Sequence, residues 1–215
     1  MIRFSNIEVF GFDAAIRGMR NPLNSWHLSD SYWTHIEDTQ TLETAKYQFH
    51  VGENDLNLMK QLSKAGNDHG KFLRMINVTV DIEAPLYWWK EFDTYKVGTV
   101  ANSCSTMHKI QAKEFTYEDF SIEHLNEASM LRMKDVLHIL NFHREKFIET
   151  GDKAYWWQMI QLLPSSYNQK RTAQLNYQVL KSMYYARKNH KLDCWREFCK
   201  WCETLPYFKE ICIEM

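Results

Sequence analysis

Regular alternation of apolar and polar side chains marks a β-strand over residues 75–82. The apolar positions recur at every second residue, which predicts a strand with one buried face and one polar face in a half-exposed sheet. A second strand is predicted over residues 2–12, where β-favouring and aromatic residues continue as far as Gly11. The apolar residues of the first pattern are Ile76, Val78, Val80 and Ile82.

Helical periodicity dominates the remaining chain. Residues 55–65 place Leu58, Met59 and Leu62 on one helical face, and Gly66 follows where a helix commonly ends. Pro85 suits the start of a helix over residues 86–95. Residues 20–49 show no sustained period and predict mostly loop. Further helices are predicted over residues 13–19, 121–150, 151–163, 172–189 and 193–204.

The elements are distributed over the chain without a border between domains. No internal repeat, low-complexity segment or shift in composition divides the sequence. We therefore predict one domain over residues 1–215, of the α+β class with helix dominating.

Composition and charge argue against several classes of function. The chain has 215 residues, of which 45% are hydrophobic, so it can bury a substantial core. Its 26 basic and 27 acidic side chains nearly balance and give no electrostatic support for binding nucleic acid or an anionic membrane. No stretch approaches the roughly 20 apolar residues of a membrane span, and charged Arg3 and Glu8 interrupt the first residues, unlike a signal peptide. We expect a cytoplasmic protein.

The five cysteines form an odd set gathered mostly near the C-terminus, which favours reduced thiols over a secreted disulfide scaffold. Cys199 and Cys202 have the spacing of a metal or redox pair, and His190 and Cys194 lie nearby, so a zinc-stabilised module is a minor alternative. No second paired motif completes a zinc ribbon, and small thiols commonly fill the core side of a helix. We therefore predict no metal.

Three segments carry side chains suited to phosphate or proton chemistry. His69, between the helix over 55–65 and the strand over 75–82, suits phosphate contact or proton transfer, or faces solvent. Residues 96–108 carry hydroxyls and amides that bind anions or build an ordinary loop. Arg17 and Arg20 suit bidentate phosphate binding or a solvated surface. No phosphate-binding glycine loop or hydrolase elbow is present in the sequence.

A core strand, Ala84-Pro85, an apolar helix and a polar loop follow one another over residues 78–105. This order resembles the central segment of flavin-dependent thymidylate synthases, in which an Ala-Pro-aromatic helix leads into an Arg-His-Arg signature. Without gaps, Glu91 takes the place of the Gln before the signature, and residues 94–96, Thr-Tyr-Lys, take the place of Arg-His-Arg. Thr99 matches the Ser that follows. Ala101, Asn102, Cys104 and Thr106 fall where the family has Asn, an acidic residue, Ser and Arg.

A second stretch, in the same register, resembles the family's nucleotide-binding C-terminal region. Asn176 corresponds to a flavin contact and Arg187 to a pyrimidine-nucleotide contact, whereas Gln178 replaces an arginine. His69 falls where the family has a histidine that contacts flavin. The other matching residues are Leu163, Pro164, Thr172, Leu180 and Tyr184.

The resemblance implies the helix-dominated fold of thymidylate synthase-complementing proteins, with a central antiparallel sheet packed with several helices, and a homotetramer with shared sites. The family transfers a methylene group from methylenetetrahydrofolate to dUMP, while FAD relays reducing equivalents from NADPH. Replacing two signature arginines, at Thr94 and Lys96, removes guanidinium groups that bind phosphate and polarise the uracil ring. Ordinary thymidylate synthase activity is therefore expected to be weakened or lost.

These matches assign roles to individual residues. Catalytic roles are implied for Arg187 and Lys96, which with Gln178 would also contact the nucleotide, and Arg20 is added as a phosphate ligand. Two functions follow: a diverged FAD-dependent thymidylate synthase-like protein that binds flavin, a pyrimidine nucleotide or both, and a non-catalytic interaction protein that kept the fold but lost the site. The implied FAD contacts are His69, Asn176, Thr99, Asn102 and Ser105.

Overall fold

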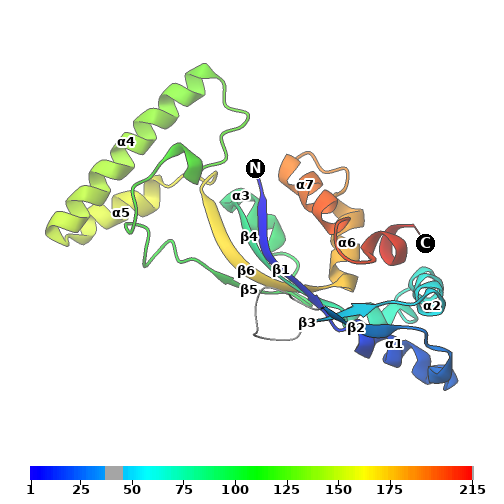
Figure 1. The fold of residues 1–215 in the computed structure, drawn as a ribbon. Coiled ribbons are helices and arrows are strands. Elements are labelled where there is room, and N and C mark those ends of the chain that lie inside the picture. The colour runs from blue at the N-terminus through cyan, green and yellow to red at the C-terminus, as the bar shows by residue number, and fades with distance from the viewer. Residues whose placement is uncertain (37–45, 215) are drawn as a thin grey trace.

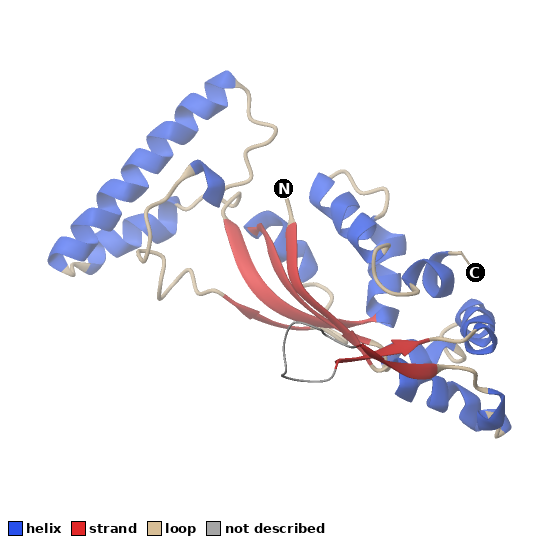
Figure 2. Ribbon diagram, viewed as in Figure 1, coloured by secondary structure: helices blue, strands red, loops and turns tan. Residues whose placement is uncertain are grey.

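A four-stranded antiparallel sheet, with strand order β1-β4-β6-β5, forms the centre of the computed structural model (Figures 1 and 2). The structure describes residues 1–36 and 46–214, so part of the loop predicted over 20–49 lies outside the described residues. The α+β prediction is confirmed, because several helices pack with this sheet. The strands are β1 (Arg3–Phe10), β4 (Asn77–Pro85), β5 (Val100–Ser103) and β6 (Asn168–Asn176), and a separate hairpin pairs β2 (Tyr32–Ile36) with β3 (Lys46–His50).

Strand β4 supplies the inner face of the sheet. Its apolar side chains are fully buried, while Thr79 and Asp81 on the opposite face are partly exposed. β4 pairs with β6 over nine residues, from Asn77 opposite Asn176 to Pro85 opposite Asn168. Because the two strands continue as α3 and α6 at opposite ends of the pair, this register fixes where both helices begin.

The helices pack around two hydrophobic cores. The main core joins the inner face of the sheet to α1, α3, α6 and α7, and Trp88, Trp89 and Trp195 are among its largest buried side chains. A smaller core lies beneath α4 and α5, which project as an arm from the end of the sheet away from α6 and α7 (Figure 1). The helices are α1 (Phe12–Arg20), α2 (Glu53–Lys64), α3 (Leu86–Phe92), α4 (Glu127–Thr150), α5 (Lys153–Leu162), α6 (Tyr177–Arg187) and α7 (Asp193–Cys202). Shorter 3-10 turns and the π-helical turn η5 (Lys209–Ile213) connect them.

Three predictions of secondary structure were wrong. β6 occupies the first residues of the helix predicted over 172–189, because pairing with β4 and β5 overrides the helix-favouring Gln, Lys, Arg and Ala of its sequence. β5 forms within the predicted polar loop, since it adds to the open edge of β6. The β2–β3 hairpin lies within the predicted loop over 20–49.

In the part of the chain that the structure describes, no helix is long and apolar enough to span a bilayer.

Candidate functional site

A pocket of about 510 Å³ lies where α6 begins. It brings together three of the predicted site residues, Lys96, Asn176 and Gln178, which are up to 82 positions apart in the sequence. We call it the α6 pocket, and its polar wall consists of Asn67, Arg74, Lys96, Asn176, Gln178 and Ser182, with Tyr95 beside them.

The end of β6 positions the first turn of α6 against the pocket. The Tyr177 backbone N–H donates to the Ile76 carbonyl over 3.0 Å, which continues the pairing of β4 with β6. The Asn176 side-chain oxygen then accepts from the Val179 backbone N–H over 3.0 Å and caps the helix. The side-chain amide of Gln178 donates to the Asn67 side chain over 3.3 Å and joins α6 to the loop that follows α2.

Close approach of the residue 96–99 loop completes the wall of the α6 pocket. Gly98 has φ of 77°, a left-handed conformation that favours glycine. A Cβ atom there would lie 2.9 Å from Val179 Cγ2 and 3.0 Å from Asn176 Nδ2, so the loop lies directly on the first turn of α6. Lys96, two residues earlier, is thereby held at the helix end.

The α6 pocket is electropositive. Arg74 and Lys96 are both exposed, and among the described residues neither has a hydrogen-bond or ion-pair partner. No described carboxylate lines the pocket. Two cations, side-chain amides and the positive end of the α6 dipole favour an anionic ligand such as a phosphate.

Arg187 lies outside the α6 pocket, and its guanidinium is engaged within the chain. Its Nε donates to the Tyr95 hydroxyl over 2.9 Å, and its Nη1 donates to the Glu91 carboxylate over 2.7 Å. The guanidinium carbon also lies 4.7 Å from the Trp195 ring centroid. Because Tyr95 lines the pocket, Arg187 reaches the site through this ring.

His69 lies next to the α6 pocket but opens onto a different one. It lines a cavity of about 750 Å³ between α1, α2 and the turn that precedes β4. Asn67 lines the α6 pocket, whereas Asp68 and His69 line this second cavity, so the two cavities are separated by the turn of residues 66–70. The predicted flavin contact at His69 is thus a neighbour of Lys96 and Asn176 and does not share their pocket.

The other three predicted flavin contacts have local structural partners. The Thr99 hydroxyl donates to the Tyr95 carbonyl and fixes the turn after α3. The Ser105 hydroxyl accepts from the backbone N–H groups of Met107 and His108 over 3.2 and 3.1 Å. Asn102 is exposed on edge strand β5, opposite Thr172 of β6. None of the three lines the α6 pocket.

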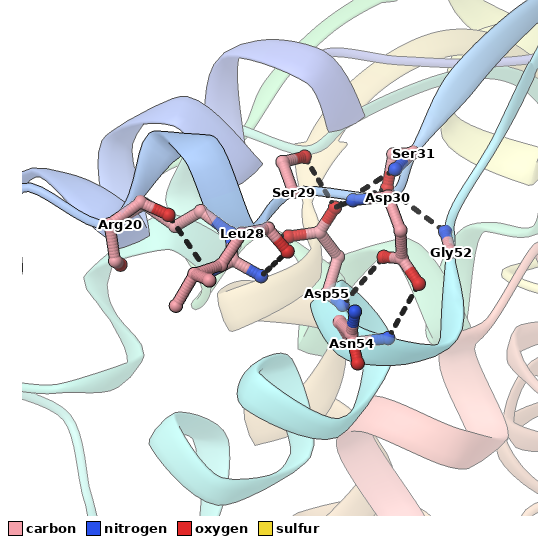
Figure 3. A network of polar contacts seen from close by, with 9 residues as sticks. Arg20, Leu28, Ser29, Asp30, Ser31, Gly52, Asn54 and Asp55 are labelled. Carbon is pink, nitrogen blue, oxygen red and sulfur yellow. Dashed lines mark hydrogen bonds and ion pairs between the residues drawn. The ribbon is translucent and has the colours of Figure 1, made fainter.

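Arg20 lies in a buried polar network, and with Arg17 it lines a separate cavity of about 430 Å³ rather than the α6 pocket. Its Nε donates to Asp55 over 2.6 Å, and the two side chains are 4% and 0% exposed (Figure 3). Its other nitrogens donate to the carbonyls of Ser25 and Leu28, each over 3.2 Å. Arg20 therefore ties α1 and the segment after it to α2, and the α6 pocket does not include it.

Asp55 is ionised at the centre of this network. Burial raises its pKa, but hydrogen bonds from Ser29, Ser31 and Arg20, together with the charge of Arg20, outweigh burial and lower the pKa overall. Ser29 and Ser31 each donate a hydroxyl to Asp55 over 2.6 Å (Figure 3). The network ties the N-terminal segment to α2, and two of its members, Arg20 and Ser29, also line the cavity of about 430 Å³.

The zinc alternative gains no support from the geometry. Cys194, Cys199 and Cys202 are buried in the main core. Across residues 1–36 and 46–214, no three His, Cys, Asp or Glu side chains gather as a metal site would require. These thiols act as small core residues of α7.

Sequence reasoning missed Arg74, Asn67 and Ser182. Arg74 ends the 3-10 turn η3 (Gly70–Arg74), with two residues between it and β4, and the β4–β6 register pairs Asn77 at the start of β4 with Asn176, which lines the pocket. That register could not be inferred once β6 was predicted as helix. The sequence signal for Arg74 is a basic residue immediately before the strand predicted over residues 75–82.

Comparison with known proteins identifies the class of fold. No protein-family model matches the chain, and no curated protein matches it by sequence. A solved structure of a flavin-dependent thymidylate synthase, ThyX from Helicobacter pylori in complex with FAD and dUMP, matches with a TM-score of 0.67. The match covers 98% of this chain and 99% of that one at 16% identity.

A second solved structure of Helicobacter pylori ThyX, also with FAD and dUMP, gives the same TM-score of 0.67 at 14% identity over 100% of this chain and 98% of that one. The chain therefore has the fold of flavin-dependent thymidylate synthases over its whole length, as the resemblance implied.

Proposed function

We propose that the protein binds a phosphate-bearing pyrimidine nucleotide in the α6 pocket. The observation that carries this proposal is the pair of cations, Arg74 and Lys96, at the N-terminal end of α6, which among the described residues have no partner and no acidic neighbour in the pocket. The fold supports the proposal, because the similar ThyX structures were solved with dUMP and FAD. The pocket volume of about 510 Å³ suits a mononucleotide.

Each polar residue has a distinct role in this proposal. Arg74 and Lys96 bind the phosphate oxygens through charge-assisted hydrogen bonds. Asn176 and Gln178 face the pocket with amide groups that suit the carbonyl and N–H edge of a pyrimidine. Arg187 acts as a positioning residue, because it holds the Tyr95 hydroxyl at the pocket wall.

FAD is the cofactor that the fold family implies, and the donor set fits its phosphates. Arg74 and Lys96 would hold either the nucleotide phosphate or the FAD pyrophosphate, not both at once, and His69, in the adjoining cavity of about 750 Å³, suits a further contact. When bound, flavin would supply the relay of reducing equivalents from NADPH. Methylation of dUMP with methylenetetrahydrofolate is the corresponding activity, and we propose it at a reduced rate, because Thr94 and Lys96 stand where the family has arginines.

Isothermal titration calorimetry with dUMP tests the nucleotide site. Deoxyuridine, which lacks only the phosphate, is the matched ligand. We expect Lys96→Gln and Arg74→Gln each to weaken dUMP binding by about tenfold to a hundredfold, since one charged hydrogen bond contributes about 1.5–3 kcal/mol. Deoxyuridine binding should change little.

Lys200→Gln, which removes an exposed lysine of α7 outside the pocket, is the control for net charge. Equal binding of dUMP and deoxyuridine by the wild-type protein would contradict the proposal. The visible absorbance of protein incubated with FAD and then desalted reports flavin binding separately.

The alternative of a non-catalytic interaction protein is favoured by one observation on the α4–α5 arm. Leu131, Ile139 and Phe142 of α4 and Trp157 of α5 are 42 to 53% exposed, although the other side of the arm packs on the smaller core. Such a surface suits a homo-oligomer, as the resemblance to a tetrameric family implies. Light scattering after gel filtration measures the oligomeric state, and a monomer would argue against this use of the arm.

A further inference from the structure

A further cavity lies on the side of the molecule formed by the β2–β3 hairpin and the C-terminal turn. Its volume is about 780 Å³, and residues from the end of β1, the start of α1, β2, β3, the segment before η5 and η5 itself line it. Six aromatic rings contribute to its wall: Phe10, Phe12, Trp33, Tyr47, Phe49 and Tyr207. We call this cavity the aromatic pocket.

Several rings of the aromatic pocket are exposed to solvent instead of being buried in the core. Phe10, Trp33 and Tyr47 are 48%, 54% and 63% exposed, so they add little to the core of the fold. Rings open to solvent around a concavity are typical of a binding surface.

Internal contacts hold the rings in place. Tyr207 packs edge-to-face on Phe12, with ring centroids 5.6 Å apart, and its hydroxyl accepts from the Val51 backbone N–H over 3.2 Å. Trp33 packs against Phe49 across the hairpin at 4.9 Å. A preformed wall lowers the entropic cost of binding a ligand.

The charge of the aromatic pocket has one sign. Asp13 and Glu210 line it, and no described Lys, Arg or His does. Neither carboxylate has an ion-pair or hydrogen-bond partner among the described residues. The neighbouring cation Lys209 is directed to Glu203, with Nζ 3.6 Å from the carboxylate.

Asp13 also borders the smaller cavity beside Arg17 and Arg20, but neither arginine lines the aromatic pocket. Asp13 stands in the first turn of α1, where its charge also suits the helix dipole. Glu210 lies in the first turn of the five-residue π-helical turn η5.

We propose that the aromatic pocket binds an organic ammonium ion. The faces of Trp, Tyr and Phe rings carry negative potential that attracts a cation, and the two carboxylates add to this attraction. A phosphate or carboxylate ligand would be repelled, so the pocket differs in ligand class from the electropositive α6 pocket. An ammonium group is presented either by a free polyamine or by a lysine side chain.

Calorimetric titration of the full chain tests this proposal with three probes. Spermidine represents a free polyamine, Nα-acetyl-lysine methylamide represents a lysine side chain, and the corresponding norleucine compound is the neutral isostere. We expect the cationic probes to bind and the norleucine compound not to bind. Tighter binding of spermidine would assign the site to free polyamines, and tighter binding of the blocked lysine would assign it to a side chain.

Two kinds of variant distinguish the contribution of the carboxylates to cation binding from that of the aromatic rings. The Asp13→Asn, Glu210→Gln double variant should weaken cation binding by about tenfold or more, because each charge-assisted contact is lost. Trp33→Leu keeps an apolar side chain without the π-face and should weaken binding by about threefold to tenfold. Glu8→Gln removes an exposed β1 carboxylate outside the pocket and should change binding by less than about twofold.

Thermal melting of each variant confirms that it is folded before titration. The proposal is overturned if neither cationic probe binds the folded protein or if the norleucine compound binds as tightly as the lysine probe. It is also overturned if the Asp13→Asn, Glu210→Gln double variant retains wild-type affinity.

Discussion

Arg187 of α6 donates a hydrogen bond to Glu91 of α3 over 2.7 Å, and the same carboxylate oxygen accepts from Trp195 Nε1 over 2.9 Å. The arginine that corresponds to a nucleotide contact in the resemblance is therefore already paired with an anion of its own chain. Glu91 stands where the family has glutamine, so one substitution supplies the charge that holds Arg187 in place. The cations that remain available for a ligand in the α6 pocket are Lys96 and Arg74.

Replacing Arg187 with lysine tests this structural role. Lysine keeps the charge but loses the planar contacts to Tyr95, Glu91 and Trp195. We expect Arg187→Lys to lower the free energy of unfolding by about 1–3 kcal/mol and to weaken dUMP binding less than Lys96→Gln does. Urea unfolding and calorimetry provide the two measurements.

Tyr95→Phe removes only the hydroxyl that Arg187 contacts and serves as the matched control for that bond. Loss of dUMP binding by Arg187→Lys without loss of stability would place Arg187 in direct contact with the nucleotide.

The close approach of Gly98 to α6 leads to a second prediction, which concerns dUMP binding in the α6 pocket. Gly98→Ala places a Cβ atom 2.9 Å from Val179 Cγ2 at a φ of 77°, so the loop that carries Lys96 must move. We expect dUMP affinity to fall by about tenfold or more, because a cation displaced by even 1 Å loses its directed contact. Calorimetry measures the change.

Gly151→Ala is the control for backbone strain alone. Gly151 has φ of 69° at the end of α4, and a Cβ atom there would have no neighbour within 4 Å. Both variants should lose about 1 kcal/mol or more of stability from the left-handed conformation. If Gly98→Ala binds dUMP as well as Gly151→Ala does, the loop is not part of the nucleotide site.

The buried pair of Arg20 and Asp55 predicts both a mutational and a pH effect. Asp55→Asn leaves Arg20 buried without its counter-charge and should cost about 3–5 kcal/mol of stability. The pKa of Asp55 is lowered below its usual 3.8 in the folded protein, so its contribution is present above that value and is lost as the pH falls through the folded pKa.

Urea unfolding from neutral pH down to the acid limit of the folded protein measures this dependence. The wild-type stability should fall more steeply below about pH 4 than that of Asp55→Asn, since the variant has no such proton to bind. Asp68→Asn, which changes an exposed carboxylate on the turn before β4, should keep the wild-type slope. Equal acid slopes for wild type and Asp55→Asn would show that this carboxylate does not control acid stability.

The difference between β4 and β6 explains how far the sequence predicts the fold and the site. β4 has four buried apolar residues at alternate positions, so its periodicity alone identifies it. β6 has only Ala173 and Leu175 as buried apolar residues on its inner face, and pairing with two neighbours makes it a strand. Local pattern cannot reveal such an element, because its stability comes from contacts with distant segments.

The residues of the candidate site also differ in whether the sequence alone could predict them. Lys96, Asn176 and Gln178 were found because the resemblance follows the order of the chain, and the structure brings them together. Arg74 was missed because it lines the same pocket as Asn176 only once β4 and β6 are paired, with Asn77 opposite Asn176. The partners of Arg20 and Arg187, Asp55 and Glu91, lie 35 and 96 residues away, so sequence alone could not show that these cations were already paired.

Thiol reactivity tests the packing of the C-terminal helices. Cys104 is exposed, whereas Cys194, Cys199, Cys202 and Cys212 are buried. Burial raises the pKa of Cys199 to about 11 and that of Cys212 to about 12, so few thiolates are present there near neutral pH. We expect one of the five cysteines to react rapidly with Ellman's reagent in the folded protein, and all five after denaturation.

Cys104→Ser should abolish the rapid phase, and prior treatment with a chelator should leave it unchanged. Rapid reaction of further thiols only after chelation would revive the zinc alternative for Cys199 and Cys202, because metal release would expose ligands. Rapid reaction without chelation would instead show that α7 opens readily from the core, which the full burial of Trp195 and Phe198 argues against.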